Sequence, residues 1–198
     1  MRLTKFLPLA AILLVACVDT TGITGDIHKM PHPKSNAVAA VTVVEYADFQ
    51  CPACAAAHEK IVKPLLEQYG SKVRFEHRHF PLQSIHPYAM NLAEASECAA
   101  DQGKFWEFAD MAFEHQKELG VGVIRQWAQS LSLDMDLFDR CTKSHIKRDA
   151  LIAEYDGGKD LGIQGTPTFL VNGQIIDLGK QNVLEVVGKT IQSVGARL

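Results

Sequence analysis

The feature that most constrains this chain is a pair of cysteines two residues apart, Cys51-Pro52-Ala53-Cys54, set between an apolar run and a helix-forming run. The β-branched residues within Val41 to Asp48 predict a buried strand directly before the pair. Pro52 suits the first turn of a helix, and the residues after Cys54 favour helix. The sequence therefore predicts two thiols at the start of a helix that follows a strand.

This position favours redox chemistry. The first turn of a helix offers unpaired backbone N–H groups and the positive end of the helix dipole, and both stabilise a thiolate. The thiolate is the nucleophile of disulfide exchange. We expect Cys51 to be the exposed, attacking thiol and Cys54 to be the resolving thiol. Apolar neighbours on both sides favour a buried Glu45 beneath the helix start, where its pKa is raised and its carboxyl group can relay protons. The alternative is a solvated strand residue.

The remaining pattern predicts one α/β domain. Lys72 to Phe80 alternates in the manner of a second strand, and Pro64 is expected to kink or break the helix before it. Asn172-Gly173 between two apolar runs predicts a β-hairpin, and Gln181 to Val194 a final helix. The order is therefore β-α-β, a block of helices, then β-β-α. The helices expected in the block are Pro87 to Asp101, Lys104 to Gln116, Val121 to Ser130, Met135 to Lys143 and Ile146 to Leu161.

The N-terminus has the pattern of an export signal. Basic residues precede an apolar core, Phe6 to Ala16, that is too short to span a bilayer comfortably. The core ends in Leu-Val-Ala-Cys17, which resembles the bacterial lipobox. We therefore expect residues 1–16 to be a lipoprotein signal peptide, with lipid on Cys17; the alternative is an ordinary signal peptide with an incidental cysteine. Residues 17–37 are expected to be a flexible tether and 38–198 a single domain.

Four further cysteines remain once Cys17 carries lipid, and an even number in an exported protein suggests disulfide chemistry before metal chemistry. Cys98 and Cys141 both fall in the helical block, and we expect a structural disulfide between them. The alternative is two separate buried thiols. A formal net charge of −3 without a basic run argues against nucleic acid as a partner.

Four strings together resemble the DsbA-like thiol:disulfide oxidoreductases: EYADFQCPAC, RHFPL with the later HP, ECAADQGKFWEF, and GIQGTPTFLVNG. The resemblance extends over the chain from Val38 onward. It implies a thioredoxin-like fold with an all-helical domain inserted at about residues 84–160. It also implies that Cys51 exchanges with substrate, that Cys54 resolves, and that Glu45 is a buried acid.

The same resemblance assigns the substrate side of the site. Pro167 would be cis and face the cysteine pair, and the backbone of Thr166 would pair with an extended peptide as an added strand. The implied partners are unfolded or partly folded exported proteins with cysteines, together with a membrane redox partner. The protein would act as a monomer in the bacterial cell envelope, lipid-anchored to a membrane and facing the periplasm or exterior. No cofactor beyond the cysteine pair is implied.

Two departures from the family pattern bear on the direction of electron flow. Strongly oxidising members tend to have a histidine where this chain has Ala53, and Thr166 resembles reducing or isomerising relatives as much as oxidising ones. We expect an oxidase rather than a reductase or isomerase. Its potential should fall between about −270 and −120 mV, the values of thioredoxin and DsbA.

Two other functions fit parts of the pattern. Cys51-x2-Cys54-x3-His58 could be drawn as the site of a periplasmic copper or zinc chaperone lipoprotein. A structural zinc site usually needs a second ligand pair, which the sequence does not supply, so we expect no metal. A binding lipoprotein with an inert disulfide is the third possibility. It conflicts with a cysteine pair at a helix terminus, where a disulfide should be reducible.

Overall fold

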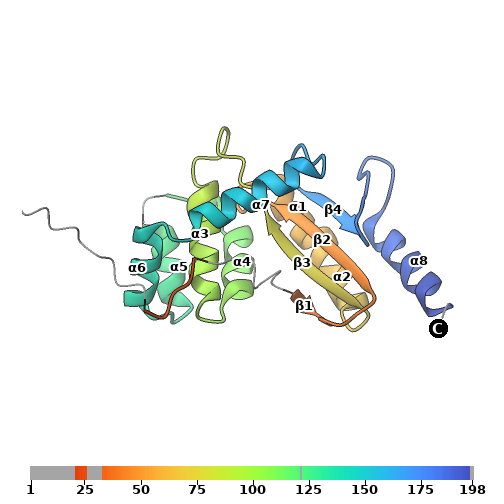
Figure 1. Cartoon of the computed structure of the whole chain (residues 1–198), viewed down its shortest axis with the longest axis horizontal. Helices are drawn as coiled ribbons and strands as arrows, with labels where there is room; N and C mark the ends of the chain where they lie inside the picture. Colours follow the sequence, from red (N-terminus) through yellow and green to blue (C-terminus); the bar gives the residue numbers. More distant parts are fainter. Residues whose placement is uncertain (1–20, 26–32, 121, 197–198) are drawn as a thin grey trace, which may run out of the picture.

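The computed structural model describes residues 21–25, 33–120 and 122–196. The predicted signal peptide and Cys17 lie outside these residues. The sequence folds into a five-stranded mixed sheet with helices on both faces and a block of helices at one side (Figure 1).

The sheet has the strand order β1-β3-β2-β4-β5. The central strands β2 and β3 run parallel, and the other neighbours are antiparallel. The predicted hairpin turns at Asn172 and Gly173, whose φ angles of 47° and 82° both lie in the left-handed region that such a two-residue turn requires. The strands are β1 (Pro33–Ser35), β2 (Val41–Ala47), β3 (Val73–His79), β4 (Thr168–Val171) and β5 (Gln174–Ile175).

The helix that starts at the cysteine pair comprises α1 (Pro52–Ala57), a π-helical turn η1 (His58–Val62) and α2 (Lys63–Tyr69). Pro64 was expected to kink or break this helix. The structure instead widens the turn directly before it, which accommodates a ring that lacks an N–H and would clash with the carbonyl four residues earlier. The helical path therefore continues to Tyr69.

The predicted helical block is present, with the ends of its helices moved by a few residues. Its last helix, α7, does not stay within the block but reaches across to the sheet (Figure 1). The contact requires Gly158, since a Cβ there would lie 2.9 Å from the Phe80 ring and 3.0 Å from the Tyr46 ring. The helices are α3 (Ala89–Ala100), α4 (Phe105–Glu114), η2 (Gln116–Glu118), α5 (Val123–Ser130), α6 (Met135–Ser144) and α7 (Arg148–Asp160), and α8 (Val183–Gly195) closes the domain beside the sheet.

The predicted tether, residues 17–37, is wrong in part. Its residues 33–35 form β1 and pair with β3, and residues 21–25 run along the helical block, where the Thr24 N–H is 3.4 Å from Asp101. The reason is that β3 would otherwise present an unpaired edge, and a short polar segment can pair with it through its backbone alone. Within the described residues, no helix is long and apolar enough to cross a membrane.

The helical block is held by one covalent link. Cys98 on α3 and Cys141 on α6 form a disulfide, with their Cα atoms 5.8 Å apart. Both residues are buried in the core shared by α3, α4, α5 and α6, which extends to Cys51 and Cys54. The disulfide is thus on the far side of the same core that packs beneath the thiol pair.

Replacement of both Cys98 and Cys141 by alanine should lower the melting temperature by about 10 °C. Opening a closed loop with a sequence separation of 43 residues returns conformational entropy to the unfolded chain, worth about 4 kcal/mol. Thermal unfolding followed by circular dichroism measures this. The rate of thiol exchange at Cys51 should remain close to that of the wild type. Two free thiols at these positions in the native, unreduced protein would contradict the assignment.

Candidate active site

The two thiols lie at the start of α1, at the junction between the sheet and the helical block. Cys51 is the N-cap residue, in extended conformation (φ −73°, ψ 120°), and Pro52 is the first residue of the helix. Cys54 is completely buried, and Cys51 is only 5% exposed. The expectation that Cys51 would be openly exposed is therefore wrong, because the helical block folds over the helix start.

The surroundings of Cys51 stabilise its thiolate. The pKa of Cys51 falls to about 5, and the largest cause is a hydrogen bond from the thiol of Cys54. Burial opposes this fall, while Thr166 and the backbone N–H groups of Ala53 and Cys54 add to it. The sequence predicted that the helix start would be the cause of the lowered pKa. The neighbouring thiol contributes more than those backbone groups.

Cys54 has the opposite properties. Burial raises its pKa, and the hydrogen bond to Cys51 and the charge of Glu45 raise it further. Cys54 therefore keeps its proton at neutral pH and serves as the donor that Cys51 requires. It cannot attack a disulfide unless a nearby base removes that proton.

Glu45 is the acid that lies beneath this pair. It projects from β2, is 1% exposed, and its pKa rises to about 8, first through burial and then through the charge of Cys51. One of its oxygens, Oε1, is buried and makes no hydrogen bond within the described residues. Glu45 is therefore mostly protonated at neutral pH and is poised to give a proton to a departing Cys54 thiolate, or to take one from the thiol.

The loop before β4 completes the site. The peptide bond between Thr166 and Pro167 is cis, and the carbonyl oxygen of Thr166 lies 3.6 Å from the sulfur of Cys51. An apolar groove of about 300 Å³ opens beside this loop, along the helix that begins after Cys51. The groove is lined by Ala53, Ala56, Ala57, Lys60, Ile61, Pro167 and Leu178.

Sequence reasoning missed the side chains that hold the strand-to-helix loop. The Asp48 carboxylate accepts hydrogen bonds from the N–H of Leu82 (2.9 Å) and lies 2.7 Å from Nδ1 of His86. The Gln50 side chain accepts a hydrogen bond from the N–H of Tyr88 at 2.6 Å. Asp48 and Gln50 flank the aromatic Phe49 directly before Cys51. Polar residues next to a buried aromatic residue were the sequence signal that could have indicated this role.

The helical block adds one more clamp. The side-chain amide of Gln116, in η2, donates to the carbonyl oxygens of Phe49 (2.7 Å) and Cys51 (2.9 Å). The Cys51 carbonyl also accepts the first helical hydrogen bond, from the N–H of Ala55 at 3.2 Å, so Gln116 ties the loop before α1 to the start of that helix. Gln116 is far away in sequence, so no local pattern could have assigned it this role.

The structure does not support a metal site at the cysteine pair. His58 is buried, with Nε2 3.1 Å from Asp110 Oδ1, and its ring stacks on Phe113 at 4.9 Å. Across the described parts of the chain, no three or more His, Cys, Asp or Glu side chains are grouped as metal ligands. The alternative set of Cys51, Cys54 and His58 is therefore not assembled as a coordination shell.

Comparison with known proteins agrees with this geometry. A family model described as thioredoxin matches residues 34–192, which is most of the chain. The chain belongs to the thioredoxin family. Its predicted fold class, a thioredoxin-like fold with an inserted helical domain, is confirmed.

Three solved structures illustrate the likeness. Oxidised BdbD of Bacillus subtilis is 23% identical with a TM-score of 0.70, over 85% of this chain and 94% of that one. DsbA1 of Wolbachia pipientis is 20% identical with a TM-score of 0.68, over 85% and 93%. DsbA2 of Pseudomonas aeruginosa is 25% identical with a TM-score of 0.58, over 74% and 86%. The fold is thus that of the DsbA-type proteins.

Curated relatives match over a shorter region. A protein named Na(+)/H(+) antiporter NhaA 3 from Salinispora tropica is 43% identical over 143 residues, which is 72% of this chain and 22% of that protein. NhaA 1 of Salinispora arenicola is 45% identical over 147 residues, again 72% and 22%. The chain spans about a fifth of the length of these relatives. The region that this chain shares with these relatives has the length of one domain.

Alkylation of the reduced protein by iodoacetamide should modify Cys51 with a midpoint near pH 5, while Cys54 stays unmodified at neutral pH. Cys54→Ala should move the midpoint of Cys51 upward, toward the free-thiol value of about 8.5, because the main hydrogen-bond donor is lost. Cys54→Ser, which keeps a hydroxyl donor, is the matched control and should show a smaller rise. An unchanged midpoint in Cys54→Ala would contradict this account.

Proposed function

We propose that this protein is a thiol:disulfide oxidoreductase that introduces disulfides into exported proteins through Cys51 and Cys54. The observation that carries the proposal is the contrast between the two thiols. Cys51 has a pKa near 5 and precedes the helix that lines an apolar groove, whereas Cys54 is buried and protonated. Only one sulfur is placed to form a mixed disulfide with a client, and the other is placed to resolve it.

The reaction starts from the Cys51–Cys54 disulfide. A client thiolate attacks the Cys51 sulfur, and the bond between the two enzyme sulfurs breaks. The electron pair of that bond leaves with Cys54, which takes up the proton held by Glu45. The client and Cys51 are now joined in a mixed disulfide.

A second client thiolate then attacks the client sulfur of this mixed disulfide. The client disulfide forms and Cys51 departs with the electron pair of the broken bond. It leaves as a thiolate that needs no proton at neutral pH, because its pKa is near 5. The enzyme has gained two electrons and is returned to the disulfide form by a redox partner, which we place in the membrane.

The direction of electron flow follows from the same pKa. A stabilised Cys51 thiolate favours the dithiol form over the disulfide, so the disulfide form is a good oxidant. The side chain of Ala53, between the cysteines, supplies no further donor to Cys51, in contrast to that of a histidine. We therefore propose an oxidase of intermediate potential rather than a reductase or isomerase.

The groove beside Pro167 accounts for the kind of client. Its walls are mostly alanine, isoleucine and leucine side chains, which suit an apolar segment of an unfolded chain rather than a charged small molecule. An extended client would pair with the backbone at Thr166 as an added strand and lay alternate side chains in the groove. The sulfur of Cys51 would then be within reach of a cysteine in that segment.

Replacing Cys54 by serine should trap clients as mixed disulfides with Cys51 when the variant is expressed in the cell envelope. The attacking thiol remains, and the resolving thiol is absent. Cys51→Ser is the matched control and should give almost no complexes, which non-reducing electrophoresis with mass spectrometry would show. Alkylation of the wild type in cells should find the pair mainly oxidised. A mainly reduced pool would overturn the oxidase assignment and leave a reductase or isomerase.

We also propose that the protein is tethered to a membrane by lipid on Cys17, on the support of the lipobox-like sequence alone. The wild type should partition into the detergent-rich phase of a Triton X-114 extraction because acyl chains enter the micelles. Cys17→Ser should move to the aqueous phase. A variant that stayed entirely in the detergent phase would show that Cys17 is not the anchor.

A further inference from the structure

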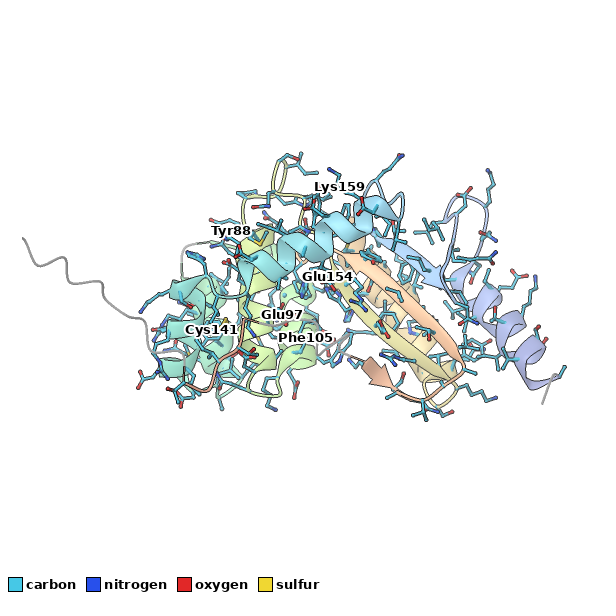
Figure 2. All side chains as sticks on the ribbon, in the orientation of Figure 1. Tyr88, Glu97, Phe105, Cys141, Glu154 and Lys159 are labelled. Carbon is cyan, nitrogen blue, oxygen red and sulfur yellow. A yellow bond between two sulfur atoms is a disulfide. The ribbon has the colours of Figure 1, made fainter. Side chains whose placement is uncertain are left out.

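The segment of residues 21–25 is docked on the helical block, although the sequence predicted that it would belong to a flexible tether. The side chain of Ile23 packs against the core of the block, which includes Cys141. Figure 2 shows Cys141 close to the path of this segment. Removing the isoleucine side chain from water favours the docked position over a freely solvated one.

The backbone of the segment also contacts the block. The side chain of Arg140 on α6 donates to the carbonyl oxygen of Thr21 at 3.5 Å. The N–H of Thr24 donates to Oδ2 of Asp101 at 3.4 Å. The other oxygen of Asp101 lies 2.8 Å from Nζ of Lys147, whose side chain is 1% exposed. Asp101 therefore joins the segment to a buried ion pair of the block.

Two glycines let the segment approach the helices closely. A Cβ at Gly25 would lie 3.2 Å from the carbonyl oxygen of Ile146, and one at Gly22 would lie 3.2 Å from the side chain of Leu137. Gly22 also has a φ of 83°, in the left-handed region that favours glycine. A larger residue at either position would press against the block, so the sequence suits the docked arrangement.

The chain is fixed again a few residues further on. β1 (Pro33–Ser35) pairs with β3, and Nζ of Lys34 lies 3.5 Å from Asp110 on α4. Residues 21–25 are thus offered to the block by a chain that is already attached to the same domain, at a high effective concentration. This second attachment favours docking of a segment that makes only a few contacts of its own.

The docked segment leaves little chain between the domain and Cys17. Thr21 is four residues after Cys17, and an extended chain covers at most about 3.5 Å per residue, so the reach is about 14 Å. A free chain from Cys17 to Ala37 would instead reach about 70 Å. A lipid on Cys17 would therefore hold the domain by its helical block, close to the bilayer.

This attachment determines which end of the molecule faces the bilayer. The segment runs beside α6, whereas α8 lies at the opposite end of the long axis (Figure 1). The outward residues of α6 include Asp136, which is exposed, and Lys143, whose side chain is 77% exposed. Charges of both signs are costly to bury in hydrocarbon, so this helix suits the headgroup layer and not the acyl chains.

We propose that residues 21–25 orient the protein on the membrane, turning the α6 end of the helical block toward the lipid headgroups and α8 away from them. The proposal rests on the lipid anchor at Cys17 proposed above and deepens it. The thiol pair, at the junction of the block and the sheet, is then held at a set height above the bilayer. A redox partner in the same membrane meets a disulfide whose height varies little.

The test uses the full lipid-anchored chain in bilayer nanodiscs that contain lipids with a gadolinium-chelating headgroup. Gadolinium weakens the NMR signals of nearby amides, and the same lipid loaded with diamagnetic lutetium gives the reference intensities. The amides of α6 (Met135–Ser144) should lose the most signal and those of α8 (Val183–Gly195) the least. Equal losses at the two helices, or a larger loss at α8, would overturn the proposal.

Two variants test whether the docked segment causes the orientation. Ile23→Asp should release the segment because a carboxylate would have to enter the apolar core, and the difference between α6 and α8 should then shrink. Val38→Asp is the matched control, since Val38 is 90% exposed, and it should keep the wild-type pattern. A long Gly-Ser insertion before Thr21 leaves the docked segment intact but lengthens the reach, so it should also reduce the difference. An unchanged pattern in Ile23→Asp or in the insertion variant would contradict the proposal.

Two further measurements separate this inference from the proposed function. Disulfide exchange with a cysteine-containing peptide in solution should be equally fast in the wild type and in the insertion variant, because the peptide approaches from the water. A wild type that does not exchange would overturn the oxidoreductase function, while the NMR losses would still decide the orientation. A wild type found wholly in the aqueous phase of the Triton X-114 extraction would overturn the lipid anchor and this orientation together.

Discussion

The hydrogen bond from the thiol of Cys54 to the sulfur of Cys51 is the interaction on which the rest of the site depends. It operates only while Cys54 holds its proton and Cys51 has lost its own. Burial of Cys54 secures the first condition, and the helix start and the neighbouring Thr166 help to secure the second. Because Cys54 is buried, water cannot reach it to give or take a proton, so proton transfer at Cys54 requires an acid or base of the protein. Glu45 is the consequence of that requirement.

The helical block is part of the site as well as a neighbour of the sheet. It supplies the core into which Cys51 and Cys54 are packed and the Gln116 amide that holds the loop before α1. It also supplies Glu97, whose carboxylate lies 2.8 Å from Nε2 of the buried His79 on β3. A sheet with α1 and α8 alone would leave Cys54 closer to water and the loop less constrained. The oxidising character proposed for the pair depends on both parts of the domain.

Local patterns in the sequence were enough to predict most of the elements and to place the two thiols at the start of a helix. The β-branched run before Cys51, the proline after it and the Asn-Gly turn each specify backbone structure through a few adjacent residues. Glu45 was placed in the interior by its apolar neighbours. What could not be predicted comes from contacts distant in sequence. The pairing of residues 33–35 with β3, the reach of α7 to the sheet and the bonding of Gln116 to Cys51 all depend on how elements meet.

The buried disulfide between Cys98 and Cys141 has a consequence for how the protein itself matures. Both cysteines are inaccessible once the helices have packed, so the bond must form while the chain is still open. A chain exported as we propose is at that moment an unfolded protein with cysteines, which is the kind of client the proposed activity serves. Mature copies could thus oxidise nascent ones, and the supply of active protein would reinforce its own production. A cell starting with none would depend on another oxidant for its first molecules.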